Sequence, residues 1–218
     1  MTIALTGRVL DEMADSAAAD IARAEGLIGQ ALASSPRSPL AHLAKGQLLR
    51  ATGRCEEAIR EYATALASNR NWASALAHTG RCKIYIGRIE EAIPLEEQAI
   101  RLSPRDNDIG VWYFRIGQVH LLQSHLDEAI VWLEKARSAN PALAFVHRWL
   151  ASAYALKGEP ARAAAELAET RRLSGNGSPS SIAQAKAADA RNFAAPAIRA
   201  LFESTYLVGL RKAGVPEI

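Results

Sequence analysis

The sequence predicts an all-α protein: a right-handed α-solenoid of helix pairs, closed by C-terminal capping helices. Three observations predict this fold. The heptapeptide GRCEEAI at residues 53–59 recurs with variations, small residues stand at fixed distances around each copy, and prolines close two of the repeated units. A period of ~34 residues with helical spacing indicates stacked two-helix units, each burying its apolar side against the next.

The repeated heptapeptide has the features of a corner between two helices. Its later copies are GRIEEAI from Gly87, SHLDEAI from Ser124 and GEPARAA from Gly158, so successive copies start 34, 37 and 34 residues apart. Each begins with a small residue that can end a helix in a left-handed turn. Acidic residues follow, where the N-terminal end of the next helix favours negative charge.

Small residues mark the places where paired helices must approach closely. Seven residues before the corners stand Gly46, Gly80, Gly117 and Ala151. The second helices carry Ala58, Ala92, Ala129 and Ala163, followed seven residues later by Ala65, Ala99, Ala136 and Thr170. Pro104 and Pro141 close two units because proline cannot continue a helix, whereas Arg70 and Gly175 hold the matching places elsewhere.

Four copies in register resemble a tetratricopeptide repeat protein over roughly residues 5–175. The resemblance divides the chain into a frayed N-terminus at 1–12, an array at 13–175 and capping helices at 176–218. Within the array we expect a half repeat at 13–36 and full repeats at 39–70, 73–104, 110–141 and 144–175.

Apolar spacing predicts the individual helices. The expected ranges are 13–33, 40–51, 55–67, 72–86, 89–102, 109–123, 126–139, 143–156, 160–173, 181–192 and 196–213. Pro94 should kink its helix, since it removes one backbone hydrogen bond. The longer third interval, at RDNDIG, should be absorbed in a loop or at the start of a helix.

Composition excludes several classes. The net charge of +3 and pI near 9.0 are far from the dense basic stripe of a nucleic-acid binder. No run of apolar residues is long enough to span a membrane, and no secretory signal is evident. Cys55 and Cys82 lack CxxC spacing and are expected to be reduced thiols, which favours a cytoplasmic protein.

A longer run and the tail suggest a finer resemblance. The run DIGVWYFRIGQVHLLQSHLDEAIVWLEKARSANPALAFVHRWLASAYALKGE and the tail ALFESTYLVGLRKAGVPE are similar to the C-terminal repeat regions of bacterial adenylate/guanylate cyclase-like proteins and winged-helix transcriptional regulators. The similarity spans the chain from about Ala19. It implies a regulatory or docking role in signalling without catalytic residues, because neither effector domain is present.

Repeat register places a set of side chains on the concave side of the array. The candidate groove residues are Gln47, Arg50, His78, Arg81, Tyr85, Phe114, Arg115, Gln118, Arg148 and Ser152, with Tyr154 nearby. Several arginines facing one channel could grip carboxylates in two-pronged fashion, so we expect an acidic peptide or a C-terminal carboxylate to bind there. The alternative is that these arginines are solvated and pair with neighbouring acids.

No metal, cofactor or catalytic site is expected. The five histidines lack zinc-ligand spacing, and His42 and His147 share one offset inside first helices, which favours packing. Trp72, Trp112, Trp132 and Trp149 are expected in the core. Nothing ties serine and histidine into an activated nucleophile, so the chain is not expected to be an enzyme.

Two functions remain open. The first is an adaptor or scaffold whose groove binds a protein segment. The second is a regulatory or oligomerisation module of a cyclase or transcription-factor system, with a homodimer sealed through the N-terminal half repeat. Small-molecule sensing is a third possibility.

Overall fold

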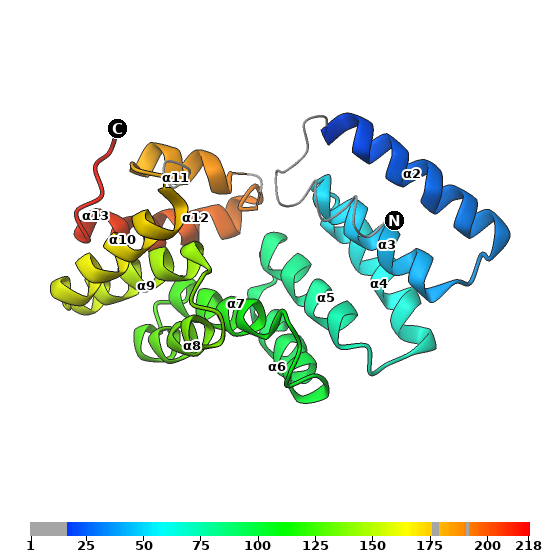
Figure 1. The fold of residues 1–218 in the computed structure, drawn as a ribbon, viewed down its shortest axis with the longest axis horizontal. Coiled ribbons are helices and arrows are strands. Elements are labelled where there is room, and N and C mark those ends of the chain that lie inside the picture. Colours follow the sequence, from blue (N-terminus) through cyan, green and yellow to red (C-terminus); the bar gives the residue numbers. More distant parts are fainter. Residues whose placement is uncertain (1–16, 176–178, 191) are drawn as a thin grey trace.

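A computed structural model describes residues 17–175, 179–190 and 192–218, and in these ranges all regular structure is helical. The helices stack side by side along an arc (Figure 1). Their bounds are α2 Ala17–Ser34, α3 Pro39–Ala51, α4 Cys55–Ser68, α5 Ala73–Tyr85, the 3₁₀ helix η1 Ile89–Glu91, α6 Ala92–Leu102, α7 Ile109–Leu122, α8 Leu126–Ala139, α9 Ala144–Lys157, α10 Pro160–Ser174, α11 Ile182–Asp189, α12 Pro196–Ser204 and α13 Tyr206–Lys212.

The corners between paired helices adopt the predicted left-handed turn. The φ angles of their first residues are +79° at Gly53, +83° at Gly87, +63° at Ser124 and +83° at Gly158. The residue after each turn donates its amide proton to a carbonyl of the preceding helix, as Arg54 N–H does to Leu49 at 2.8 Å. These bonds satisfy carbonyls that the helix end would otherwise leave without a partner.

Small residues allow the paired helices to touch, as predicted. A Cβ atom on Gly46 would lie 2.4 Å from the ring of Tyr62, and one on Gly117 would lie 2.8 Å from Leu133 Cγ. Both bulky partners are fully buried. The chain therefore forms the expected α-solenoid of helix pairs, and at these two crossings a glycine meets a large side chain.

The core runs along the stack between neighbouring pairs. Trp112 and Trp149 are 2% exposed, in agreement with the predicted core role, whereas Trp72 and Trp132 are half-buried. Cys55 and Cys82 are both buried free thiols.

Two details of the helix prediction need correction. Pro94 causes no kink inside a long helix, because η1 precedes it and α6 starts only at Ala92; proline thus lies in the first turn, where no intrahelical partner is lost. The last helix is not continuous over 196–213 but breaks at Thr205 (φ −117°, ψ −76°) into α12 and α13. The predicted frayed segment 1–12 lies outside the described residues, as does the start of the half repeat.

Two of the three extra residues of the third interval lengthen the loop before α7, which has six residues against four between α4 and α5, and the third lengthens α7 itself. Residues 103–108 form turns in which Asp106 Oδ1 accepts the backbone N–H of Asp108 at 3.0 Å. The first helix of the third full pair, α7, then begins at Ile109.

The C-terminal helices cap the stack by packing on α9. Tyr206 stacks on Trp149 with ring centroids 4.1 Å apart, and Gly209 lies directly against Ser152. Because α9 is the first helix of its pair, these helices also reach toward the concave side. None of the helices that the structure describes is long and apolar enough to cross a membrane.

Candidate functional site: the concave groove

A cavity of about 560 Å³ lies along the first helices of successive pairs. Four helices contribute to its walls: α3, α5, α7 and α9. The C-terminal end of α11 and the segment after it close one side. Nine of the residues predicted from the sequence to face the groove line this cavity: Gln47, Arg50, His78, Arg81, Tyr85, Phe114, Arg115, Gln118 and Arg148.

Ser152 is the one predicted groove residue that lies elsewhere. Its hydroxyl donates to the carbonyl of Tyr206 at 2.9 Å, and the side chain is fully buried under α13. The C-terminal helices cover this part of α9, which repeat register alone does not reveal. Tyr154 also faces away, donating to Glu134 at 2.6 Å.

The end of the groove formed by α3 and α5 is cationic. Arg50 is 5% exposed, and no residue in the described ranges accepts a hydrogen bond from its Nε. Arg81 Nε donates to the hydroxyl of Tyr85 at 2.7 Å. Neither guanidinium has a carboxylate within 4.0 Å among the described residues, so this end holds two arginines without an anion.

The amide of Gln47 lies between the two arginine-bearing helices. Its Nε2 is 2.9 Å from His78 Nε2, so the amide donates to the imidazole. Burial, and then the charges of Arg50, Arg115 and Arg81, hold the pKa of His78 well below its usual range. His78 is therefore neutral near pH 7 and adds no charge of its own.

Burial lowers the pKa of Arg50, and the neighbouring charge of Arg81 lowers it further. A buried cation that faces another cation is costly unless an anion joins it. The two arginines are thus arranged to gain free energy from a ligand that brings negative charge.

The other two arginines of the groove already have acidic partners. Arg115 Nη1 lies 3.1 Å from Glu96 Oε1 and 3.0 Å from the carbonyl of Ala77. Arg148 Nη2 lies 3.5 Å from Asp189 Oδ2. The cationic character of the groove is therefore concentrated at its α3 and α5 end.

Aromatic rings form the opposite end of the groove. Phe114 packs edge-on against Phe145, with centroids 4.7 Å apart, and against Trp149. Phe193 comes from the segment between α11 and α12 and meets Tyr85 edge-on. Arg199 holds this segment by donating to the carbonyls of Phe193 and Ala194.

Several residues of the site were missed by sequence reasoning. Glu96 lies in a second helix, at the position that Tyr62, Leu133 and Leu167 hold in the other pairs. The sequence did offer one indication of its role, since an acidic residue stands there at a repeat position that is otherwise bulky and largely apolar. Three further lining residues could not be found from the repeat pattern, because they lie outside the repeats, at the end of α11 or in the connection after it: Asp189, Asn192 and Phe193.

The histidines that share one repeat position have a structural role. His147 Nδ1 lies 2.6 Å from Glu166, and its Nε2 donates to the carbonyl of Pro141 at 3.0 Å. His42 repeats this arrangement with Glu61 and Pro36. Both side chains are thus held by hydrogen bonds inside their helix pairs. In the part of the chain that the structure describes, no cluster of three metal-ligating side chains occurs.

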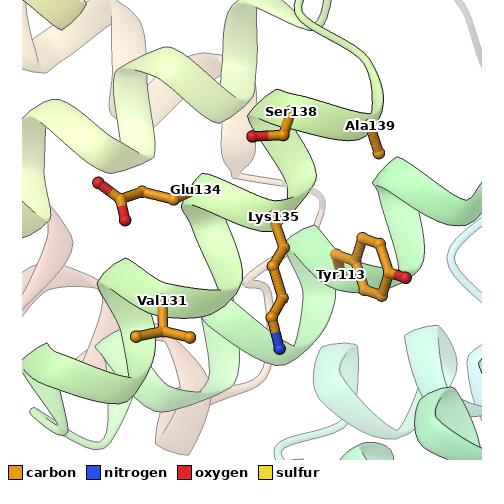
Figure 2. Close-up of a pocket in the computed structure, with 6 residues that line it drawn as sticks. All are labelled: Tyr113, Val131, Glu134, Lys135, Ser138 and Ala139. Carbon is orange, nitrogen blue, oxygen red and sulfur yellow. The ribbon is translucent and has the colours of Figure 1, made fainter.

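A second hollow, on the surface of α7 and α8, is less suited to a ligand (Figure 2). Its charged groups are already engaged: Glu134 accepts from Tyr154, and Lys135 lies 4.1 Å from the centroid of the Trp132 ring. Figure 2 shows its residues spread along two helices and not converging on one point.

Comparisons with known proteins agree with this architecture. The family model described as "Tetratricopeptide repeat" matches residues 14–75 and 43–107. PilF of Pseudomonas aeruginosa superposes with a TM-score of 0.69 at 20% identity, over 98% of this chain and 97% of that one. The chain has the tetratricopeptide-repeat fold.

Two further solved structures resemble it. PilW, described as a widely conserved type IV pilus biogenesis factor, gives a TM-score of 0.67 at 18% identity, over 93% of this chain and 92% of that one. YrrB, described as a TPR protein with an unusual peptide-binding site, gives 0.57 at 19% identity, over 85% and 90%. No curated protein matches the chain. These matches support the repeat resemblance and give no support to the finer one with cyclase-like proteins and winged-helix regulators.

Proposed function

We propose that this tetratricopeptide-repeat protein is a non-catalytic adaptor whose concave groove binds an acidic segment of a partner protein. Arg50 and Arg81 support the proposal most directly, since both line the groove and neither has a carboxylate partner in the described ranges. Arginine binds carboxylates in bidentate fashion, and burial strengthens the attraction.

Stability considerations favour a binding role for Arg50. A buried cation without an anion destabilises the fold, so packing alone does not account for this residue. The aromatic wall around Phe114 and Phe145 adds a place for an apolar side chain of the same segment. YrrB provides a precedent, because its description names a peptide-binding site on the same fold.

Fluorescence anisotropy with a rhodamine-labelled hexaglutamate peptide tests the proposal, with hexaglutamine as the uncharged control. The double variant Arg50→Gln/Arg81→Gln should bind hexaglutamate at least ~10-fold more weakly, because two charge-assisted contacts are lost. Binding should also weaken as salt rises. Reversing Arg115 is a poorer test, since a new acid there would face Glu96.

The matched control is Arg60→Gln/Arg101→Gln, which removes the same charge from exposed positions on α4 and α6. It should retain the affinity of the unaltered protein within about twofold. Equal loss in both double variants, or no loss in either, would refute the groove as the binding site. Arg81→Gln alone serves if the double variant fails to fold.

The alternative function is a regulatory or oligomerisation module of a cyclase or transcriptional-regulator system, self-associating through α2. One observation favours an unfilled surface there: Ala31 is exposed, whereas its repeat equivalents Ala65 and Ala99 are fully buried. Light scattering on the isolated protein tests this alternative. A dimer that dissociates when Ala31 is replaced by a charged residue would support it, and a monomer would contradict it. A cytoplasmic location, which fits either function, remains an expectation.

A further inference from the structure

Glu96 is a fully buried acid placed directly beneath the groove. It lies on α6 against Gly80 of α5, where a Cβ atom would be only 3.0 Å from the carboxylate Oε1. The equivalent residues of the other pairs, Tyr62, Leu133 and Leu167, are bulky and buried. Packing at this position therefore does not require a carboxylate.

The carboxylate holds one of the four groove arginines. Its Oε1 accepts from Arg115 Nη1 at 3.1 Å, and no described residue donates a hydrogen bond to its Oε2. Arg115 itself is only 6% exposed and lines the groove. When Glu96 is ionised, its negative charge neutralises the positive charge of Arg115.

We propose that Glu96 sets the charge of the groove floor: its ionised carboxylate neutralises Arg115, and protonation frees that charge for an acidic ligand, which then binds more tightly as the pH falls through neutrality. The inference rests on the proposed function of the groove. It assigns control of the affinity for anionic ligands to Glu96, which is fully buried and does not itself line the groove.

The surrounding charges are consistent with titration in the right range. Burial raises the pKa of Glu96 to about 7, while Arg115 of α7 and Arg81 of α5 act in the opposite direction. Glu91 of η1 is engaged with Lys83 and Arg88 at the surface, and Glu97 on α6 itself lies 4.0 Å from Arg101.

Two other titratable residues line the groove, His78 and Asp189. His78 stays neutral near pH 7, since burial and three arginines lower its pKa. Burial raises the pKa of Asp189, which faces Arg148 across the groove. An Asp189→Asn variant therefore separates its contribution from that of Glu96.

Hexaglutamate binding measured by anisotropy from pH 6 to pH 8 at constant ionic strength provides the test. The peptide carboxylates stay ionised throughout, because their ordinary pKa is about 4.3. The unaltered protein should bind about 5-fold more tightly at pH 6 than at pH 8, the effect of one added charge in a partly screened site. Glu96→Gln should bind at the pH 6 level at every pH.

Asp189→Asn and the exposed control Glu97→Gln should both keep the pH dependence. A pH dependence that survives in Glu96→Gln would overturn the inference. A ligand-free readout separates this failure from failure of the proposed function: the ¹³C carboxyl resonance of Glu96 should titrate with a midpoint near neutral pH. A midpoint below about pH 5 overturns the inference, whereas absence of peptide binding at any pH overturns the proposed function.

Discussion

The imidazole Nδ1 of His147 lies 2.6 Å from the carboxylate Oε2 of Glu166, inside the contact between α9 and α10. Both side chains are buried, at 4% and 7% exposed. Leu76 and Leu95 hold the same two places in the second helix pair, and Tyr113 and Trp132 hold them in the third. These two facing repeat positions are therefore filled by a hydrogen-bonded histidine and glutamate, by two aliphatic side chains or by two aromatic rings.

Because Leu76 and Leu95 hold the same two places as His147 and Glu166, the effect of replacing the His147–Glu166 pair by two leucines can be predicted. The single variant His147→Leu should destabilise the protein by about 2 to 3 kcal/mol, because Glu166 loses a buried partner. The double variant His147→Leu/Glu166→Leu should recover most of that loss, because it reproduces the apolar pair of α5 and α6. Urea unfolding followed by circular dichroism measures both; a double variant less stable than the single one would contradict the prediction.

Close contact at Gly209 makes the cap sensitive to a single methyl group. A Cβ atom there would lie 2.1 Å from Ser152 Oγ and 2.6 Å from its carbonyl oxygen. Gly209→Ala should cost about 3 kcal/mol of unfolding free energy, since backbone cannot move aside easily. The control is Gly29→Ala in α2, which meets nothing within 4 Å and should gain up to about 1 kcal/mol from helix propensity.

Burial of Glu96 makes stability depend on pH. Its pKa is about 7 in the folded protein against an ordinary value of 4.5, so the folded state binds the proton more tightly than the unfolded state does. The contribution of Glu96 to the free energy of unfolding is therefore fully present below pH 4.5 and is lost as the pH rises through 7. The full difference is about 3 kcal/mol.

Comparison with Glu96→Gln isolates this contribution. The variant lacks the titrating group, so its stability relative to the unaltered protein should rise by about 2 to 3 kcal/mol between pH 5 and pH 8. Urea unfolding at a series of pH values tests the sign. A stability difference between Glu96→Gln and the unaltered protein that does not change with pH would show that the pKa of Glu96 is not raised by burial.

The two thiols should be unreactive in the folded protein. Cys55 is 5% exposed and Cys82 fully buried, within one apolar cluster between α4 and α5. Labelling with a thiol-specific aromatic disulfide should proceed only as fast as the protein opens, and both thiols should react at once in denaturant. Rapid labelling of either thiol in native buffer would show that this cluster is open to solvent.

Sequence periodicity predicted the repeats well because corners and crossings impose local demands. A left-handed turn at Gly87 and a close approach at Gly46 each restrict the residue type at one position, and both recur at fixed spacing. Most of the groove followed from the same register. Phe193 and the break at Thr205 could not be predicted, because they depend on how a non-repeated segment packs on α9.

Chemical-shift mapping of hexaglutamate on the ¹⁵N-labelled protein tests the central claim most directly, because it locates the bound peptide without altering any residue. If the peptide binds in the groove, the Nε–H signals of Arg50 and Arg81 and the backbone amides along α3, α5 and α7 should be perturbed. Shifts confined to the surface of α7 and α8 around Lys135, or none at a peptide concentration of several millimolar, would contradict binding in the groove.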